Sequence, residues 1–396
     1  MKAFPAEGKR FDAAGWAVCG YLLGFTLPLP LDAALLFLAA LGGYAVLTVP
    51  ARYSPSLLRV LAGLALVLAL GNAVSADPRR SLNLSLALLP AAAVCLLVAG
   101  YFRFPDMIRL CWTMTGFTIA VAGWLLLVAA THPGCPPSEW IGLSRLTAFK
   151  VPNDVVILQV FLPFSLALWR LDRVRRGRWA VPVAVMMALA VAVLYRSRLS
   201  LLVAATGVTV FYWGLGDRRR LGKMLLWGVP ALVLVDALTG FQLAEKFRSL
   251  TTAGTRLPLW IAAWRMFLEA PWTGHGVGSF RLLYRFHLQP LPEWIVVDPR
   301  ITPWAHNIFL ELLAELGVGG LLAFTLFFGF PLGLWRSIRG EEKRKKPLDI
   351  ALIAAFAGFC VAGMVELSLW RQWVGLTFLL LVGCIARQNN QNREEK

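Results

Sequence analysis

The sequence predicts an all-helical, polytopic membrane protein, and three observations lead to this fold class. First, 58% of the 396 residues are hydrophobic, and the mean hydropathy is +0.65. Second, the apolar residues gather into runs of about 20, the length of helix that crosses a hydrocarbon core of about 30 Å. Third, strongly basic segments lie between some of these runs. Because lipid cannot satisfy backbone polar groups, each spanning run is expected to be a helix.

Twelve apolar runs are long enough to span a membrane, so residues 1–396 are expected to form a single membrane domain. The predicted spans are 12–28, 31–49, 56–75, 81–101, 107–130, 153–170, 179–195, 199–216, 224–240, 316–335, 350–367 and 371–387. The opening residues, MKAFPAEGKR, show no cleavable signal pattern and lead directly into the first span. That span is expected to act as its own insertion signal.

The basic segments orient this bundle. RLDRVRRGR, DRRRLGK and SIRGEEKRKK follow the sixth, eighth and tenth predicted spans, on the side that holds both termini. The positive-inside rule makes that side the cytoplasm. This bias accounts for most of the net charge of +17, so no nucleic-acid partner is expected. The six cysteines lie mostly within spans and share no metal-like spacing, so neither a disulfide framework nor a cysteine metal site is implied.

The first four spans have short loops and few polar residues, and they are expected to be scaffold. The outer loop after the fifth span, THPGCPPSEWIGLSRLTAFKVPND, carries Arg145, Lys150 and, at the start of the next span, Asn153. Basic residues on the outer side oppose the orientation rule. Two interpretations stay open, because these side chains either reach along the helix end to the interface or contact an anionic ligand.

Two arginines mark the outer turn between the seventh and eighth spans. Arg196 and Arg198 lie in YRSRLS, which leaves almost no loop. Guanidinium groups in so tight a turn are hard to hydrate unless they face a polar cavity. We therefore expect a functional role for Arg198.

The longest outer segment, residues 241–305, lies between the ninth and tenth spans and is expected to contain short helices. Its basic residues outnumber its acidic ones, and the simplest cause is an anionic ligand. The basic residues are Lys246, Arg248, Arg256, Arg265, Arg281, Arg285 and Arg300, and the acidic ones are Glu245, Glu269, Glu293 and Asp298. A helix over RLPLWIAAWRMFLEA would place Arg256 and Arg265 on nearly opposite faces, which predicts different roles for them.

The next elements are a turn and a helix start. TGHGVGSF is glycine-rich enough for a tight turn, but without a preceding strand it is not a dinucleotide fingerprint. After Pro303, His306 and Asn307 are expected near a helix N-terminus at the membrane surface, where backbone N–H groups favour anions. Glu311 and Glu315 fall on another face of that helix and are interpreted as packing or interface residues.

Arginines and a histidine define the expected chemistry. No paired carboxylates stand at a suitable spacing on the outer face, and the four histidines are scattered, so no metal or cofactor is expected. Arginine binds phosphate through bidentate charge-assisted bonds, and histidine exchanges a proton near neutral pH. Together they suit displacement at a carbon whose leaving group is a diphosphate. His306 would either deprotonate an attacking sugar hydroxyl or contact the phosphates.

The order and spacing of these motifs resemble the O-antigen ligase and O-antigen polymerase superfamily of bacterial envelope glycosyltransferases. The matching residues are Arg256, Trp260, Pro271, Gly274, Gly276, Gly278, His306, Asn307, Glu315 and Gly317. Upstream, SRLS at 197–200 is similar to the family's Ser-Arg turn, and VPND at 151–154 is similar to its Pro-Asn element. Leu199 departs from this pattern, which has a small residue after the arginine.

The resemblance implies a metal-independent, inverting transfer of a glycan from an undecaprenyl diphosphate carrier to a sugar hydroxyl. The reaction would take place at the periplasmic face of the bacterial inner membrane, with both termini cytoplasmic. At the matched positions, Arg198 and Arg256 would bind the diphosphate and His306 would be catalytic. Arg145 and Arg265 lie near the motifs and are expected to add contacts to the diphosphate. Four further residues are expected to support the site: Lys150, Asn153, Arg196 and Asn307.

Four functions are compared. In an O-antigen ligase, the first choice, the acceptor is the lipid A-core oligosaccharide, whereas in a polymerase it is another carrier-linked repeat unit. A protein O-oligosaccharyltransferase would carry larger outer domains, and none is obvious in the sequence. A secondary transporter or lipid flippase would show repeat symmetry and charges near mid-span. The charged residues instead cluster at one surface, with the largest loop in the second half only.

Overall fold

The computed structural model describes residues 54–146, 149–171, 177–238, 251–288, 302, 304–339 and 346–394, and these residues form helices and connections without a β-strand. The first half contains α3 (Pro55–Val74), α4 (Pro78–Leu86), α5 (Leu89–Tyr101), α6 (Phe104–Thr131), α7 (Pro137–Ser144), η1 (Pro152–Val155), α8 (Val156–Val160), α9 (Leu162–Leu171) and α10 (Gly177–Leu194). The second half contains α11 (Arg198–Leu215), α12 (Arg218–Leu238), α14 (Thr251–Glu269), α15 (Phe280–Leu283), η2 (Tyr284–His287), α16 (Ile308–Leu326), α17 (Gly329–Arg339), α18 (Pro347–Val365) and α19 (Gln372–Glu394).

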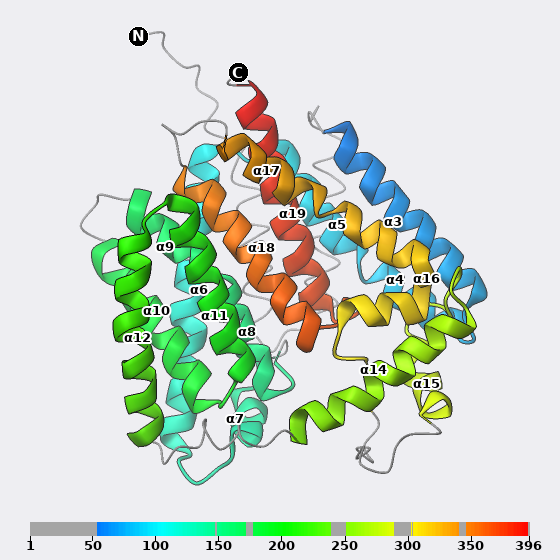
Figure 1. Cartoon of the computed structure of the whole chain (residues 1–396), viewed down its shortest axis with the longest axis horizontal. Helices are drawn as coiled ribbons and strands as arrows, with labels where there is room; N and C mark the ends of the chain where they lie inside the picture. Colours follow the sequence, from blue (N-terminus) through cyan, green and yellow to red (C-terminus); the bar gives the residue numbers. More distant parts are fainter. Residues whose placement is uncertain are drawn as a thin grey trace.

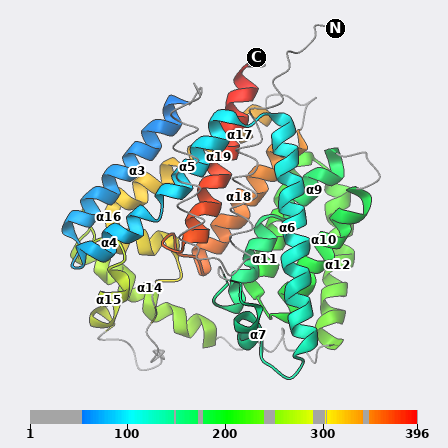
Figure 2. The ribbon, with the colours of Figure 1, turned by 180° about the vertical axis from the view of Figure 1, so that it is seen from behind.

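Two groups of helices flank a central pair, α18 and α19 (Figures 1 and 2). On one side, α11 packs along α18, and α6, α9, α10 and α12 lie beyond it. On the other side, α5 packs along α19, with α3, α4 and α16 outside it. The helices α7, α14 and α15 gather at the end of the bundle opposite the C-terminus.

The structure confirms a helical polytopic membrane protein, while the count of twelve spans stays a prediction. Seven described segments are long and apolar enough to cross a membrane: Pro55–Val74, Pro78–Tyr101, Phe104–Thr131, Pro152–Leu171, Arg198–Leu215, Ile308–Arg339 and Pro347–Val365. Trp179–Leu194 is a shorter apolar helix. The predicted spans at 12–28 and 31–49 lie outside the described residues. Each of the other predicted spans coincides with one helix or with consecutive helices.

Three of the predicted spans are interrupted. The span at 81–101 is divided between α4 and α5, 153–170 among η1, α8 and α9, and 316–335 between α16 and α17. Pro90 and Pro163 stand near the starts of α5 and α9. Proline has no backbone N–H to donate to the preceding turn, which explains why a new helix starts at these two positions.

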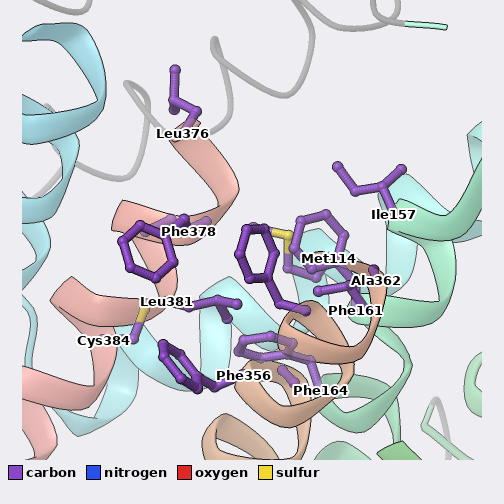
Figure 3. Close-up of a cluster of buried hydrophobic side chains, with 14 of the residues drawn as sticks. Met114, Ile157, Phe161, Phe164, Phe356, Ala362, Leu376, Phe378, Leu381 and Cys384 are labelled. Carbon is purple, nitrogen blue, oxygen red and sulfur yellow. The ribbon is translucent and has the colours of Figure 1, made fainter. Parts of the chain in front are cut away.

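Close packing holds the centre together, because lipid provides no hydrophobic drive between helices and small residues let them approach. A Cβ atom added at Gly214 of α11 would come 2.6 Å from Ile350 of α18, and one added at Gly358 of α18 would come 3.2 Å from Val203. Aromatic rings fill the adjoining interior (Figure 3). Phe378 of α19 stacks on Phe324 of α16, with ring centroids 4.9 Å apart.

The glycine-rich turn that the sequence predicts is hydrogen-bonded to a break in α16. Gly317 lies inside α16 at φ 61° and ψ −159°, and Val318 N donates to Pro271 O at 2.8 Å. In the other direction, two amides of the turn donate to α16: His275 N to Ala314 O at 3.1 Å and Gly276 N to Glu315 O at 2.8 Å.

The carboxylate of Glu315 adds two further hydrogen bonds between α16 and the glycine-rich turn. It accepts hydrogen bonds from Gly278 N at 2.7 Å and from Phe280 N at 2.9 Å, and the side chain is buried. The interpretation of Glu315 as a packing residue is therefore confirmed. These two N–H groups are already satisfied within the chain, so they are not offered to a phosphate.

Candidate active site

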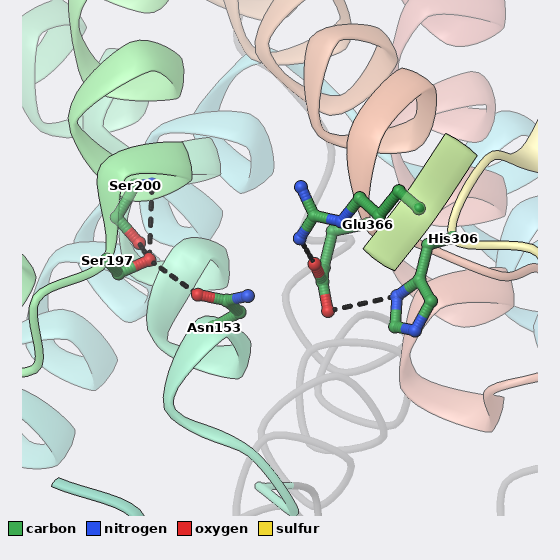
Figure 4. Close-up of polar contacts among 6 residues, drawn as sticks. Asn153, Ser197, Ser200, His306 and Glu366 are labelled. Carbon is green, nitrogen blue, oxygen red and sulfur yellow. Dashed lines mark hydrogen bonds and ion pairs between the residues drawn. The ribbon is translucent and has the colours of Figure 1, made fainter. Parts of the chain in front are cut away.

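Three segments distant in sequence meet at the carboxylate of Glu366. This residue follows α18 and is 3% exposed. Arg256, on α14, donates from Nη2 to its Oε2 atom, and Nδ1 of His306 lies 3.2 Å from its Oε1 atom (Figure 4). The structure thus brings together Arg256 and His306, two residues that the sequence proposes for the site, through a carboxylate that sequence reasoning missed.

Opposing effects set the charge of Glu366. Burial raises the pKa of its carboxyl group, but the contact with His306 and the positive charges of His306, Arg256 and Arg371 outweigh burial and hold the pKa below its ordinary value. The carboxylate is therefore ionised near neutral pH. An ionised oxygen beside Nδ1 favours a proton on that nitrogen, which leaves Nε2 of neutral His306 with a lone pair.

Acid is expected to remove the stabilisation that this cluster provides. Because the pKa of Glu366 is lower in the folded state, its ion pairs stabilise the fold at pH values above the ordinary glutamate pKa of about 4.3, and this contribution is lost as pH falls through the folded-state pKa. Melting temperatures in detergent between pH 7 and pH 3 should show wild type above Glu366→Gln near neutrality, with the difference narrowing in acid. A difference that stays constant over this range would contradict the assignment.

The backbone around His306 has an unusual shape. His306 adopts φ 55°, in the left-handed region that non-glycine residues seldom occupy and that is often found at functional sites. Asn307 caps α16, since its Oδ1 atom accepts from Phe309 N at 3.0 Å and Leu310 N at 3.1 Å. The helix start after His306 is where the sequence predicts it. These two amides are satisfied by Asn307, so its support for the site is structural.

A second ion pair adjoins the first. Arg371 Nη2 lies 2.6 Å from Asp154 Oδ2, and its guanidinium group stands 5.0 Å from the ring centroids of both Trp304 and Trp373. The same Asp154 oxygen accepts from Lys150 N at 2.7 Å. Arg371 therefore contacts both the Pro-Asn element, through Asp154, and the segment that carries His306, through Trp304.

The Ser-Arg turn and the Pro-Asn element are also joined. Ser197 Oγ donates to Asn153 Oδ1 at 3.4 Å and accepts from Ser200 N and Ser200 Oγ at 3.3 and 2.8 Å. Figure 4 shows the amide oxygen of Asn153 turned toward Ser197. Arg198 opens α11 beside this cap, and the charge of Arg256 acts on it. Leu199, the departure from the family pattern, is buried in the core.

The other residues proposed from the sequence lie around this centre or away from it. Arg265 follows Arg256 by nine residues, about 13 Å along α14, and donates from Nη1 to His287 O at 3.0 Å. Arg145 ends α7 at φ 54° with an exposed side chain, and the Lys150 side chain is also exposed. Arg196 forms the turn before α11 at φ 52°, where its N–H donates to Val193 O at 2.9 Å.

The site that emerges is cationic and partly open. Arg256 and His306 keep 18% and 22% of their side-chain surface exposed, whereas Glu366 is buried behind them. A guanidinium group has five N–H donors, so Arg256 can bond both Glu366 and an anion. Charged residues at the ends of the two last predicted spans were the available signal for Glu366 and Arg371, because charges beside apolar spans mark functional positions.

Fold and site together define a helical membrane protein with arginine side chains and a carboxylate-supported histidine at one end of its bundle. The family model described as O-antigen ligase matches residues 182–325, from α10 into α16. This match supports the O-antigen ligase and polymerase superfamily, whose members are glycosyltransferase-like enzymes of O-antigen processing. The matched region contains Arg198, Arg256 and His306. No curated protein matches the chain.

Proposed function

We propose that the protein is an O-antigen ligase, which transfers a glycan from undecaprenyl diphosphate to a sugar hydroxyl of the lipid A-core oligosaccharide. The observation that carries the proposal is that Glu366 joins Arg256 and His306, both of which lie in the region that the family model matches. One carboxylate orients both a phosphate-binding group and a proton-accepting group. That pairing suits a reaction in which a hydroxyl loses a proton while a diphosphate departs.

In the proposed step, Nε2 of His306 takes the proton of the acceptor hydroxyl. The hydroxyl oxygen attacks the anomeric carbon from the face opposite the diphosphate, so a new C–O bond forms as the C–O bond to the diphosphate breaks. The configuration at that carbon inverts. The diphosphate leaves with the electron pair, and Arg256 and Arg198 stabilise its growing negative charge. Glu366 stabilises the imidazolium ion that forms, as a buried carboxylate does for a catalytic histidine.

Metal independence is part of the proposal. Arg198, Arg256 and Arg371 all act electrostatically on the site, and their positive charges disfavour a divalent cation beside them. Arginine side chains therefore take the role that metal ions fill in many diphosphate-releasing enzymes.

We place the site at the periplasmic face of the inner membrane, with both termini in the cytoplasm. Figure 1 shows the C-terminus at the end of the bundle opposite α7 and α14. Basic residues in described parts of the predicted cytoplasmic segments include Arg170, Arg218, Arg219, Arg220 and Arg339. Their number on that side supports this orientation through the positive-inside rule.

Reconstituted transfer tests this function. Purified protein in liposomes, given carrier-diphosphate glycan and lipid A-core, should produce a more slowly migrating glycolipid without added divalent metal. Omitting the lipid A-core should abolish the product. Longer carrier-linked chains in that control would instead identify a polymerase.

Genetics separates the same two functions in cells. A strain without a ligase should place no O-chain on its core oligosaccharide, whereas a strain without a polymerase still places a single repeat unit there. A single attached repeat after deletion would overturn the ligase proposal and support the polymerase.

A further inference from the structure

A second cluster of ionisable side chains lies outside the Glu366 site. Glu269 is the last residue of α14, His275 lies in the glycine-rich turn and His287 is the last residue of η2. One potential ligand atom from each of the three lies within 4.8 Å of the others. His287 Nε2 is 2.6 Å from Glu269 Oε2, and the two imidazole rings are 5.8 Å apart between centroids.

Backbone carbonyl groups fix the protonation of both rings. His275 Nε2 lies 2.9 Å from Met266 O, and His287 Nδ1 lies 2.9 Å from Leu283 O. A carbonyl oxygen only accepts hydrogen bonds, so each of these nitrogens carries a proton. In the neutral ring the other nitrogen has a lone pair. Metal-bound histidines characteristically donate their second N–H to a carbonyl group in this way.

The contact between His287 and Glu269 needs a positive species. When Nδ1 of a neutral ring is the donor, its Nε2 lone pair faces the Glu269 carboxylate at 2.6 Å, and two lone pairs at that distance repel. Either a second proton on His287 or a metal ion bound by both groups removes this repulsion. The nearby His275 provides a third ligand, which a simple histidine–glutamate ion pair does not require.

We propose that Glu269, His275 and His287 form a binding site for one divalent transition-metal ion of the zinc class. Two imidazole nitrogens and one carboxylate oxygen are a common ligand set for zinc, with water in the fourth position. Tetrahedral ligands at about 2.0–2.1 Å from zinc stand about 3.3 Å apart. The contact between His287 and Glu269 would therefore open, and His275 would approach within the 4.8 Å that bounds the three ligand atoms. Glu269 has 63% of its side-chain surface exposed, which permits this shift and gives the ion a path of entry.

The position of this site gives it a structural role distinct from glycan transfer. Glu269 lies thirteen residues after Arg256 on α14, about 20 Å along the helix. A metal ion here would join the end of α14, the glycine-rich turn and η2. It would thereby hold the start of the segment that leads from Arg256 to His306.

Metal titration of the intact protein in detergent tests the proposal. After chelator treatment and dialysis, Zn²⁺ is added in competition with a chromophoric chelator, and Co²⁺ is followed by visible absorption. Wild type should bind one ion per chain, with the intense visible bands of tetrahedral Co²⁺. His275→Ala and His287→Ala should each weaken binding by at least about 100-fold, since even outer-sphere partners account for 10- to 100-fold.

Two further variants make the result specific. His132→Ala removes an exposed histidine at the end of α6 and should bind as wild type does. His287→Cys exchanges one zinc ligand for another and should restore binding, adding a sulfur-to-cobalt charge-transfer band. Absence of saturable binding in wild type, or equal binding by wild type and His287→Ala, would show that a proton occupies the contact and would overturn the proposal.

Discussion

Replacing His306 with alanine is expected to lower the rate of glycan transfer by about 10²- to 10⁴-fold, the range that a general base contributes. His306 is the only imidazole that contacts Glu366 among the described residues, and its Nε2 atom is the proposed proton acceptor. Initial rates with carrier-diphosphate glycan and lipid A-core measure the effect. His132→Ala is the matched control, because it removes an exposed histidine from another helix and should leave the rate unchanged.

Companion variants separate proton transfer from phosphate binding. Arg256→Ala should also lower transfer strongly, but through loss of donor binding and leaving-group stabilisation. Glu366→Gln keeps the shape of the side chain and removes its charge, so it should reduce the rate less than His306→Ala does. Full activity of both His306→Ala and Arg256→Ala in folded protein would refute the site. Melting temperatures of all variants establish that they are folded.

Replacing Gly317 with alanine is expected to destabilise the protein by about 3 kcal/mol or more and to abolish transfer. At φ 61° and ψ −159°, Gly317 occupies a region that is essentially restricted to glycine, where other residues are strained by about 1–3 kcal/mol. The new Cβ atom would also lie 2.6 Å from Pro271 O and 2.7 Å from Trp272 C. Both neighbours are backbone atoms, so no side-chain rotation relieves the overlap.

Gly319→Ala provides the matched control in the same helix. A Cβ atom at Gly319 would have Val67 Cγ2 at 3.8 Å as its nearest neighbour, an ordinary contact. Thermal unfolding in detergent should give a melting temperature several degrees lower for Gly317→Ala than for Gly319→Ala. Equal melting temperatures would contradict the described geometry of the break.

Hydropathy located helices well because the bilayer sets their length. The predicted spans at 56–75, 107–130 and 350–367 begin and end within about three residues of α3, α6 and α18. Hydropathy does not reveal where a helix breaks inside an apolar run. The irregular backbone at Gly317 is stabilised by hydrogen bonds from residues more than thirty positions earlier in the chain. The hydropathy of the local sequence does not report such long-range hydrogen bonds.

Candidate site residues could be predicted from the sequence where charged or polar side chains lie beside apolar, membrane-spanning segments. Arg198, Arg256 and His306 stood out as polar residues at the predicted outer surface. Helical periodicity predicts different faces for Arg256 and Arg265, and in the structure they contact Glu366 and His287 O. Glu366 was missed because its partners lie 60 and 110 positions away, so only the tertiary fold identifies it. The clustering of histidines was missed for the same reason, since His275 and His287 approach Glu269 only after the turn folds back.

The hydrogen bonds from His275 N to Ala314 O and from Gly276 N to Glu315 O close the chain between them into a ring. For a flexible ring the entropy of closure grows only with the logarithm of its length, so doubling the number of residues costs about 0.6 kcal/mol. By this relation alone, a change in the number of residues within the ring carries only a small cost in closure entropy. The two hydrogen bonds at its base therefore hold the two ends of this stretch together beside the break in α16, whatever the number of residues between them.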